Sequence, residues 1–185
     1  MSLKPWKVSR ENPLADMGIF QLYERYAVSP RTGSERRIAL VHTGDWVNMI
    51  PLTPDNEVVL VRQWRHGTKT FTLEIPGGLV DPGECPVEAA AREVREETGH
   101  VGDPPELLGV VEPNPAFLDN RCYTYLLENC HEVGGLMQDD GEDIEVVTLP
   151  LAEIPARIAH GEIQHALVIC GFFWLAQRGG LDLRP

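Results

Sequence analysis

The chain has 185 residues, of which 43% are hydrophobic and 24% are charged, so it can bury one sizeable core and need not be divided. Its 28 acidic and 16 basic side chains give a formal net charge of -12, which argues against nucleic acid or an anionic membrane as a partner. The N-terminus lacks the apolar core of a signal peptide, and the four cysteines form no close pairs. We therefore expect a cytoplasmic protein with reduced thiols.

Strands dominate the predicted elements of the first two thirds of the chain. In the first 45 residues we expect two strands, over residues 19–29 and 36–42. Residues 46–52 and 58–63 are predicted to form a hairpin around a turn that contains Pro54. Further strands are predicted over residues 71–75, 107–112, 122–128 and 145–149.

Three helices are predicted, one in the middle of the chain and two near its end. The first covers residues 86–98, because Pro86 is tolerated in a first turn and Gly99 fits the position after a last turn. The other two cover residues 154–159 and 165–178. Strands followed by helices indicate an α+β or layered fold.

The middle helix carries three carboxylates, Glu93, Glu96 and Glu97, at spacings of three and four residues. Such residues project from one face of a helix, where like charges are destabilising unless a cation neutralises them. Oxygen ligands of this kind suit Mg²⁺ or Mn²⁺ better than Zn²⁺. Arg92 lies one turn before Glu96 and can hold that carboxylate in one orientation.

The helix also has an apolar stripe beside the acidic one. Val87, Ala90, Ala91 and Val94 fall on this stripe, so we expect it to be buried. The neighbouring acids would then face a cleft. The alternative interpretation of the same pattern is an exposed helix with charges on its surface.

Residues 78–99 resemble the signature of the Nudix hydrolases, in which a glycine, a glutamate and an Arg-Glu-x-x-Glu-Glu segment recur at fixed spacing. The one departure is His100, where the family has an aliphatic residue. The matching residues are Gly78, Glu84, Arg92, Glu93, Val94, Glu96, Glu97 and Gly99.

This resemblance implies a Nudix-type α/β/α sandwich around a mixed sheet, formed by residues 46–185, with residues 1–45 as a small antiparallel sheet that joins two subunits. It also implies Mg²⁺-dependent hydrolysis of a diphosphate bond, with Mn²⁺ as a possible substitute.

The resemblance assigns roles within the signature. Glu93, Glu97 and the backbone carbonyl of Gly77 are the expected metal ligands, and Glu96 bridges or polarises. Glu84 and Arg92 orient these carboxylates, whereas Gly78 and Gly99 have structural roles.

Features outside the signature resemble the ADP-ribose pyrophosphatase branch. Pro115 lies sixteen residues after Gly99, as in that branch, although an ordinary loop proline is the alternative. Arg65 matches an arginine that contacts substrate phosphate, and Glu74 is a second candidate for the cleft. Tyr23 and Arg25 match the region that touches the nucleotide base across the dimer, since aromatic and guanidinium groups hold a flat base well. Sheet or interface packing is the alternative for these two.

The general base is expected to be either Glu142, which matches a loop glutamate of some members, or an acid of the signature. The expected reaction converts ADP-ribose to AMP and ribose 5-phosphate. GDP-mannose, another sugar nucleotide or a dinucleoside polyphosphate are alternative substrates, and a non-catalytic nucleotide-sugar sensor is a further alternative. The six histidines are dispersed, and none is assigned a catalytic role.

Overall fold

The structure of the chain is a computed structural model that describes residues 2–137 and 143–184. The chain divides into two compact units. Residues 1–44 and 112–121 form the first unit, and residues 45–111 and 122–185 form the second. All four cysteines are free thiols.

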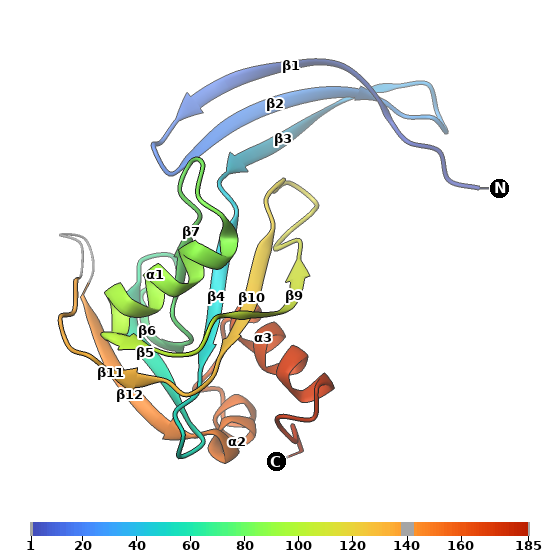
Figure 1. Cartoon of the computed structure of the whole chain (residues 1–185). Coiled ribbons are helices and arrows are strands. Elements are labelled where there is room, and N and C mark those ends of the chain that lie inside the picture. The colour runs from blue at the N-terminus through green and yellow to red at the C-terminus, as the bar shows by residue number, and fades with distance from the viewer. Residues whose placement is uncertain (1, 138–142, 185) are drawn as a thin grey trace. The chain divides into compact units, whose positions relative to one another are not determined.

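The first unit contains an antiparallel sheet of three strands, which we call the N-terminal sheet (Figure 1). Its strands are β1 (Lys7–Asp16), β2 (Phe20–Val28) and β3 (Glu35–Thr43), in this order. The sequence predicted only the last two. Strand β1 escaped prediction because it is exposed along its whole length, so no alternation of apolar residues marks it. It is held by its pairing with β2, whose register shifts near Pro13.

The second unit contains a mixed sheet of four strands and an antiparallel sheet of three (Figure 1). The mixed sheet has the order β7 (Gly77–Leu79), β4 (Trp46–Pro51), β10 (Cys122–Leu127) and β9 (Glu106–Val111). The second sheet has the order β12 (Ile144–Pro150), β5 (Glu57–Arg65) and β6 (Thr70–Glu74). A short pair joins β8 (His100–Val101) to β11 (His131–Glu132).

The predicted hairpin of residues 46–52 and 58–63 is wrong. Strands β4 and β5 belong to different sheets, and only an isolated bridge joins Leu52 to Val58 next to the turn. The reason is that both edges of β4 are already paired, in parallel with β10 and antiparallel with β7. Strand β5 pairs instead with β6 and β12.

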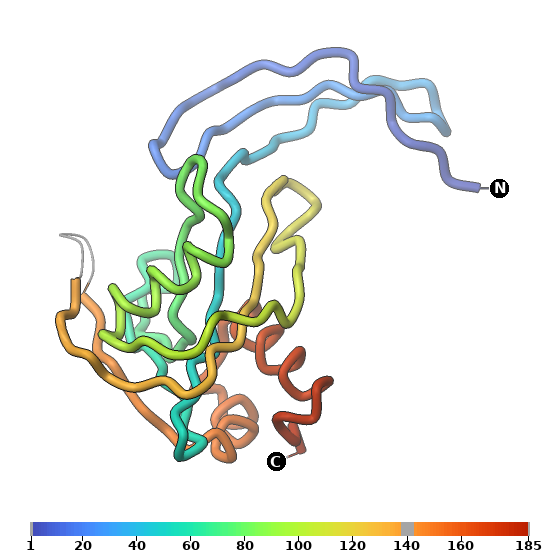
Figure 2. The backbone as a smooth tube through the Cα atoms, in the orientation of Figure 1, coloured from blue at the N-terminus to red at the C-terminus, as the bar shows by residue number. Residues whose placement is uncertain are grey.

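Helices cover both faces of the mixed sheet, as the backbone trace in Figure 2 also shows. Val47 and Met49 of β4 pack against α1 (Pro86–Thr98), whereas Ile50 of the same strand lies in the core with α3 (Ala166–Gln177). This alternation makes the α/β/α sandwich that the resemblance of the signature implies. A 3-10 turn (Leu151–Glu153) leads into the remaining helix, the short α2 (Ile154–Ala159). Among the described residues, no helix is long and apolar enough to cross a membrane.

The buried face of α1 differs from the predicted stripe. Val87 and Ala91 are exposed, whereas the buried residues are Ala89, Ala90, Glu93, Val94, Glu97 and Thr98. The stripe is rotated because α1 packs against β4 and β7, and this packing brings two of the acids inward with the alanines. These acids therefore lie between a helix and a sheet.

Candidate active site

The acids of α1 differ in their exposure to solvent. Glu93 and Glu97 are buried, with 9% and 4% of their surface exposed, whereas the side chain of Glu96 is 33% exposed. Buried carboxylates are costly unless hydrogen bonds or cations compensate for their lost hydration. The arrangement around α1 provides such compensation.

Arg92 is the cation at the centre of this cluster. Its Nε and Nη2 donate to the two carboxylate oxygens of Glu84, each at 3.0 Å, and its Nη1 donates to Glu93 at 2.9 Å and to Glu96 at 3.0 Å. Nη2 also donates to the carbonyl of Leu79 at 3.1 Å. The hydrogen bonds to Glu84 are the main reason that the pKa of Arg92 is raised, and the same bonds lower the pKa of Glu84. One guanidinium thus orients three carboxylates.

Two glycines of β7 let the strand approach the acids closely. The backbone N–H of Gly77 donates to Glu97 Oε2 at 2.9 Å. A Cβ on Gly78 would lie 2.4 Å from Glu93 Oε1, and a Cβ on Gly77 would lie 2.2 Å from the carbonyl oxygen of Val47. Side chains at these two positions would therefore displace either the carboxylate or the neighbouring strand.

The residues of the cluster fit a divalent metal ion. Their donors are all oxygens, as Mg²⁺ prefers, and the space that a Cβ on Gly78 would take is left to the carboxylate of Glu93. Within the described residues, no three Asp, Glu, His or Cys side chains already surround a common metal-sized position. Glu93 and Glu96 instead bond to Arg92, and Glu97 bonds to Gly77. The acids are therefore gathered and oriented by the protein itself.

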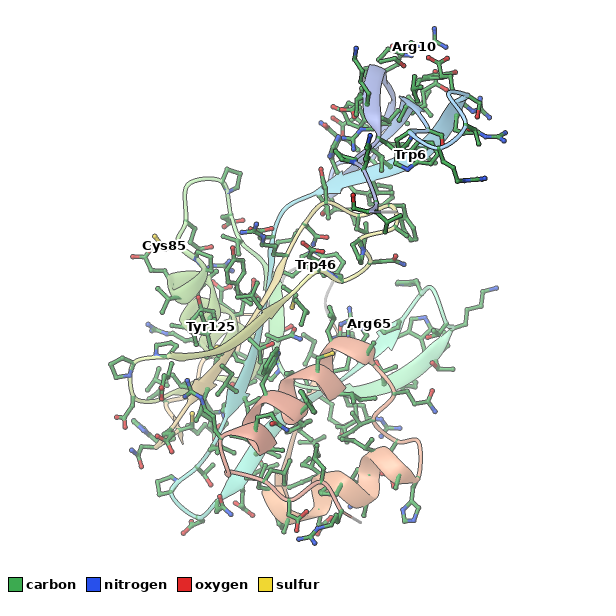
Figure 3. The ribbon with its side chains drawn as sticks, turned by 90° about the vertical axis from the view of Figure 1, so that its right-hand side faces the viewer. Trp6, Arg10, Trp46, Arg65, Cys85 and Tyr125 are labelled. Atoms are coloured by element: carbon green, nitrogen blue, oxygen red, sulfur yellow. The ribbon has the colours of Figure 1, made fainter. Side chains whose placement is uncertain are left out.

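Arg65 and Glu74 form a second charged pair in the same unit. Arg65 donates from Nε and from Nη2 to the two oxygens of Glu74, each at 2.8 Å, and Thr72 donates to Glu74 Oε1 at 2.6 Å. Burial would raise the pKa of Glu74, but these hydrogen bonds hold it below its ordinary value. The charge of Glu97 contributes to the raised pKa of Arg65, so the pair lies within electrostatic reach of α1. Arg65 is the last residue of β5 and is labelled in Figure 3.

Of three further predicted site residues, two lie in the first unit and one lies outside the described residues. Tyr23 and Arg25 belong to the N-terminal sheet, where Arg25 donates to Glu11 at 2.5 Å and the Tyr23 ring lies edge-on to His42 at 4.3 Å. Glu142 lies outside the described residues. The signature residues together with Arg65 and Glu74 all lie in the second unit.

Two residues that lie close to Glu74 were not predicted as site residues from the sequence. Thr72 faces the same side of β6 as Glu74, and this alternation was a usable signal. His165 approaches Glu74 from the residue before α3, with its Nδ1 3.8 Å from Glu74 Oε2. No local pattern connects two residues so far apart in the chain.

The fold and the acidic cluster together define a class of protein. A family model described as the NUDIX domain matches residues 43–168, about two thirds of the chain. The chain therefore belongs to the Nudix family, and it is a pyrophosphohydrolase that acts on a phosphoric anhydride. The family predicted from the signature is confirmed.

Two relatives and one solved structure show what the chain is similar to. An ADP-ribose pyrophosphatase of Mycobacterium tuberculosis is 32% identical over 155 residues, which cover 83% of this chain and 74% of that protein. An ADP-sugar pyrophosphatase of Mus musculus is 34% identical over 138 residues, which cover 68% of this chain and 62% of that protein. The crystal structure of an ADP compounds hydrolase matches with a TM-score of 0.84, 23% identity and coverage of 97% and 99% of the two chains. This last match shows the shared fold.

Proposed function

We propose that the protein hydrolyses ADP-ribose to AMP and ribose 5-phosphate in the presence of Mg²⁺. The observation that carries the proposal is the set of carboxylates on α1 that Arg92 holds together beside Gly77 and Gly78. The choice of substrate is supported by the likeness to an ADP-ribose pyrophosphatase and an ADP-sugar pyrophosphatase.

The residues that would hold Mg²⁺ are Glu93, Glu97 and the carbonyl of Gly77, with Glu96 bridging or polarising. When bound, the metal supplies positive charge that screens the diphosphate from the attacking water. Glu84 and Arg92 keep the carboxylates in place through the hydrogen bonds described above. These hydrogen bonds would favour the reaction by positioning its groups, since a fixed geometry removes much of the entropic cost of the reaction.

Arg65 is the proposed contact for a substrate phosphate. Its planar guanidinium suits an oxyanion better than a flexible ammonium does. Glu74 holds two of its nitrogens, so the guanidinium already has a defined orientation before the substrate arrives. During hydrolysis, water adds its oxygen to one phosphorus while the other phosphate leaves with the bridging oxygen and gains a proton.

A general base must take a proton from the attacking water, and the proposal keeps two candidates. Glu142 is one, and Glu96, the most exposed of the three α1 acids, is the other. The kcat of Glu142→Gln and of Glu96→Gln at saturating Mg²⁺ separates them, because loss of a general base lowers kcat by about 10² to 10⁴. Wild-type kcat in Glu142→Gln would assign the base to Glu96.

We also propose that the N-terminal sheet joins two copies of the chain. Every residue of β1 is exposed, and the first unit contains no helix among its described residues that could cover the sheet. Apolar side chains such as Leu14 and Ile19 are 60% and 67% exposed in one copy. In such a dimer Tyr23 and Arg25 would reach the nucleotide base held by the second copy.

The test of the activity is a hydrolysis screen with identification of the products. The substrates are ADP-ribose, GDP-mannose, UDP-glucose, NADH and diadenosine polyphosphates, each at several Mg²⁺ concentrations. We expect the highest kcat/KM with ADP-ribose and the products AMP and ribose 5-phosphate. A higher kcat/KM with GDP-mannose would overturn the choice of base, and no turnover on any diphosphate would overturn the activity.

A further inference from the structure

A hollow lies in the N-terminal sheet, beside the turn between β1 and β2 that Figure 1 shows. Strand β1 bulges there, because its register against β2 shifts between Pro13 and Ala15, with Leu14 in the bulge. The hollow has a volume of about 250 Å³. Pockets for drug-sized ligands have volumes of about 300–1,000 Å³, so this one suits a smaller group, of the size of a nucleotide base. Its lining residues are Pro13, Leu14, Ala15, Asp16, Gln21 and Tyr23.

One part of this lining is apolar. Pro13, Leu14 and Ala15 of β1 provide aliphatic surface, and Tyr23 of β2 adds its ring. The ring lies edge-on to His42 of β3, with 4.3 Å between the ring centroids. Aromatic and aliphatic surfaces hold a flat base well. Such contacts do not distinguish one base from another, so any selection must come from the polar part of the lining.

Gln21 is a polar side chain of the lining whose orientation is fixed by its neighbours. Its Nε2 donates to Asp16 Oδ2 at 3.0 Å, and its Oε1 accepts a hydrogen bond from the hydroxyl of Tyr23 at 3.0 Å. The backbone N–H of Gly18 also donates to Asp16, at 2.9 Å, and these bonds from Gly18 and Gln21 hold the pKa of the Asp16 carboxyl below its ordinary value. An ionised carboxylate can only accept hydrogen bonds. The amide nitrogen of Gln21 must therefore face Asp16, and its oxygen must face Tyr23.

The Gln21 amide can offer a ligand one donor and one acceptor side by side. A primary amide has two N–H groups and two lone pairs on oxygen, and among the described residues Asp16 takes one N–H and Tyr23 takes one lone pair. The side chain is exposed, so a ligand in the hollow can reach it. This pair matches the edge of adenine that carries the N6 amino group and N7. Guanine has two acceptors, O6 and N7, on the same edge, and Gln21 could satisfy only one of them.

We propose that Gln21 selects adenine as the base that enters this hollow of the N-terminal sheet. The amide oxygen of Gln21 accepts a hydrogen bond from N6, and its nitrogen donates to N7. Asp16 is a positioning residue, because it holds the amide in the orientation that adenine requires. The proposal deepens the function proposed above and rests on it where it concerns hydrolysis, since the diphosphate would lie at the α1 acids of the second copy.

The binding test compares AMP with inosine monophosphate (IMP), whose base has an oxygen acceptor in place of the N6 amino group. Calorimetry measures both Kd values for the wild type, Gln21→Leu and the control Gln177→Leu, which replaces an exposed glutamine at the end of α3. We expect the wild type and the control to bind AMP at least about tenfold more tightly than IMP, as a bidentate amide contact allows. Gln21→Leu should bind the two nucleotides equally. An unchanged preference in Gln21→Leu, or no preference in the wild type, would overturn the proposal.

Asp16→Asn tests the positioning role with the same two nucleotides. An asparagine amide can donate as well as accept, so it no longer dictates which end of the Gln21 amide faces it. We expect the preference for AMP over IMP to shrink by at least about threefold, which is less than the loss of a whole hydrogen bond. A general structural disturbance would weaken both nucleotides alike and leave their ratio unchanged. An unchanged ratio would therefore overturn the role of Asp16.

Hydrolysis kinetics separate this proposal from the function on which it rests. The substrates are ADP-ribose and inosine diphosphate ribose, which differ only at the same position of the base. We expect kcat/KM for ADP-ribose to fall about tenfold in Gln21→Leu through a higher KM, because the amide contacts the base and not the diphosphate. A fall confined to kcat would overturn the role of Gln21. Absence of turnover on both substrates, with the preference for AMP over IMP intact, would overturn only the proposed function.

Discussion

Glu97 is the acid on which the proposed metal site can be tested most cleanly. It is buried, and its Oε2 accepts a hydrogen bond from Gly77. Glu97→Gln keeps the size of the side chain and a carbonyl oxygen that can accept the same bond, but it removes the charge that a metal requires. We expect kcat/KM with Mg²⁺ to fall by at least about a hundredfold, because even an indirect partner of a metal can cost that much. Thermal unfolding should show a folded protein.

The control for this variant is Glu88→Gln on the same helix. Glu88 is exposed, and its carboxylate accepts a hydrogen bond from the backbone of Cys85 at 3.3 Å. It lies in the first turn of α1, and it is not one of the carboxylates to which Arg92 donates. Wild-type activity is expected in this control, and wild-type activity in Glu97→Gln would show that Glu97 does not bind the metal.

At the residue scale, spacing predicts contacts within one helix but not contacts between elements. The hydrogen bond of Arg92 to Glu96 follows from their separation of four residues, and the structure contains it. The pair of Arg65 with Glu74 joins two strands whose register the sequence does not state. The approach of His165 to Glu74 depends on where α3 begins in space, which no local pattern records.

At the scale of elements, the contact between β7 and α1 decides whether the acids hold their places. Gly78→Ala would put a Cβ 2.4 Å from Glu93 Oε1, so either the carboxylate or the strand must move. Overpacking of this kind costs about 1–3 kcal/mol of stability. We also expect kcat/KM to fall by at least about tenfold, since Glu93 is a proposed ligand. Urea unfolding and steady-state kinetics measure the two effects.

Gly67→Ala is the matched control for this substitution. A Cβ on Gly67 would meet no atom within 4 Å, and Gly67 does not adopt a positive φ. Its replacement tests the general effect of removing a glycine without crowding a neighbour. Equal losses in the two variants would show that the close approach of β7 to Glu93 is not what matters.

The elements themselves were predicted well wherever a periodic pattern or a boundary residue marks them. Helix α1 begins at Pro86 and ends before Gly99, whose φ of 68° is the left-handed conformation that glycine favours. Strand β1 has no such pattern, and it exists because β2 offers an edge to pair with. The wrong hairpin has the same origin, because the neighbours of β4 come from distant parts of the chain. Pairing is a property of the whole fold.

At the scale of the whole molecule, the N-terminal sheet and the turn between β1 and β2 expose apolar side chains to solvent in a single copy of the chain. Leu14 and Ile19 are largely exposed in a single copy, and solvent-exposed apolar groups of this size favour association when they gather on one surface. In a two-fold dimer each residue of the interface occurs twice. A single charged substitution therefore places two like charges in the interface.

We expect the wild-type chain to be a dimer in solution, and Leu14→Glu combined with Ile19→Glu to be a monomer. Light scattering after size-exclusion chromatography measures the mass of each. Leu183→Glu is the control, because Leu183 is an exposed apolar residue of the other unit. A wild-type monomer, or a dimer that survives both substitutions, would contradict the assignment of the sheet. If Tyr23 and Arg25 hold the base across the dimer, the monomer must also show a higher KM for ADP-ribose, since each active site would then lack the residues that the second copy supplies.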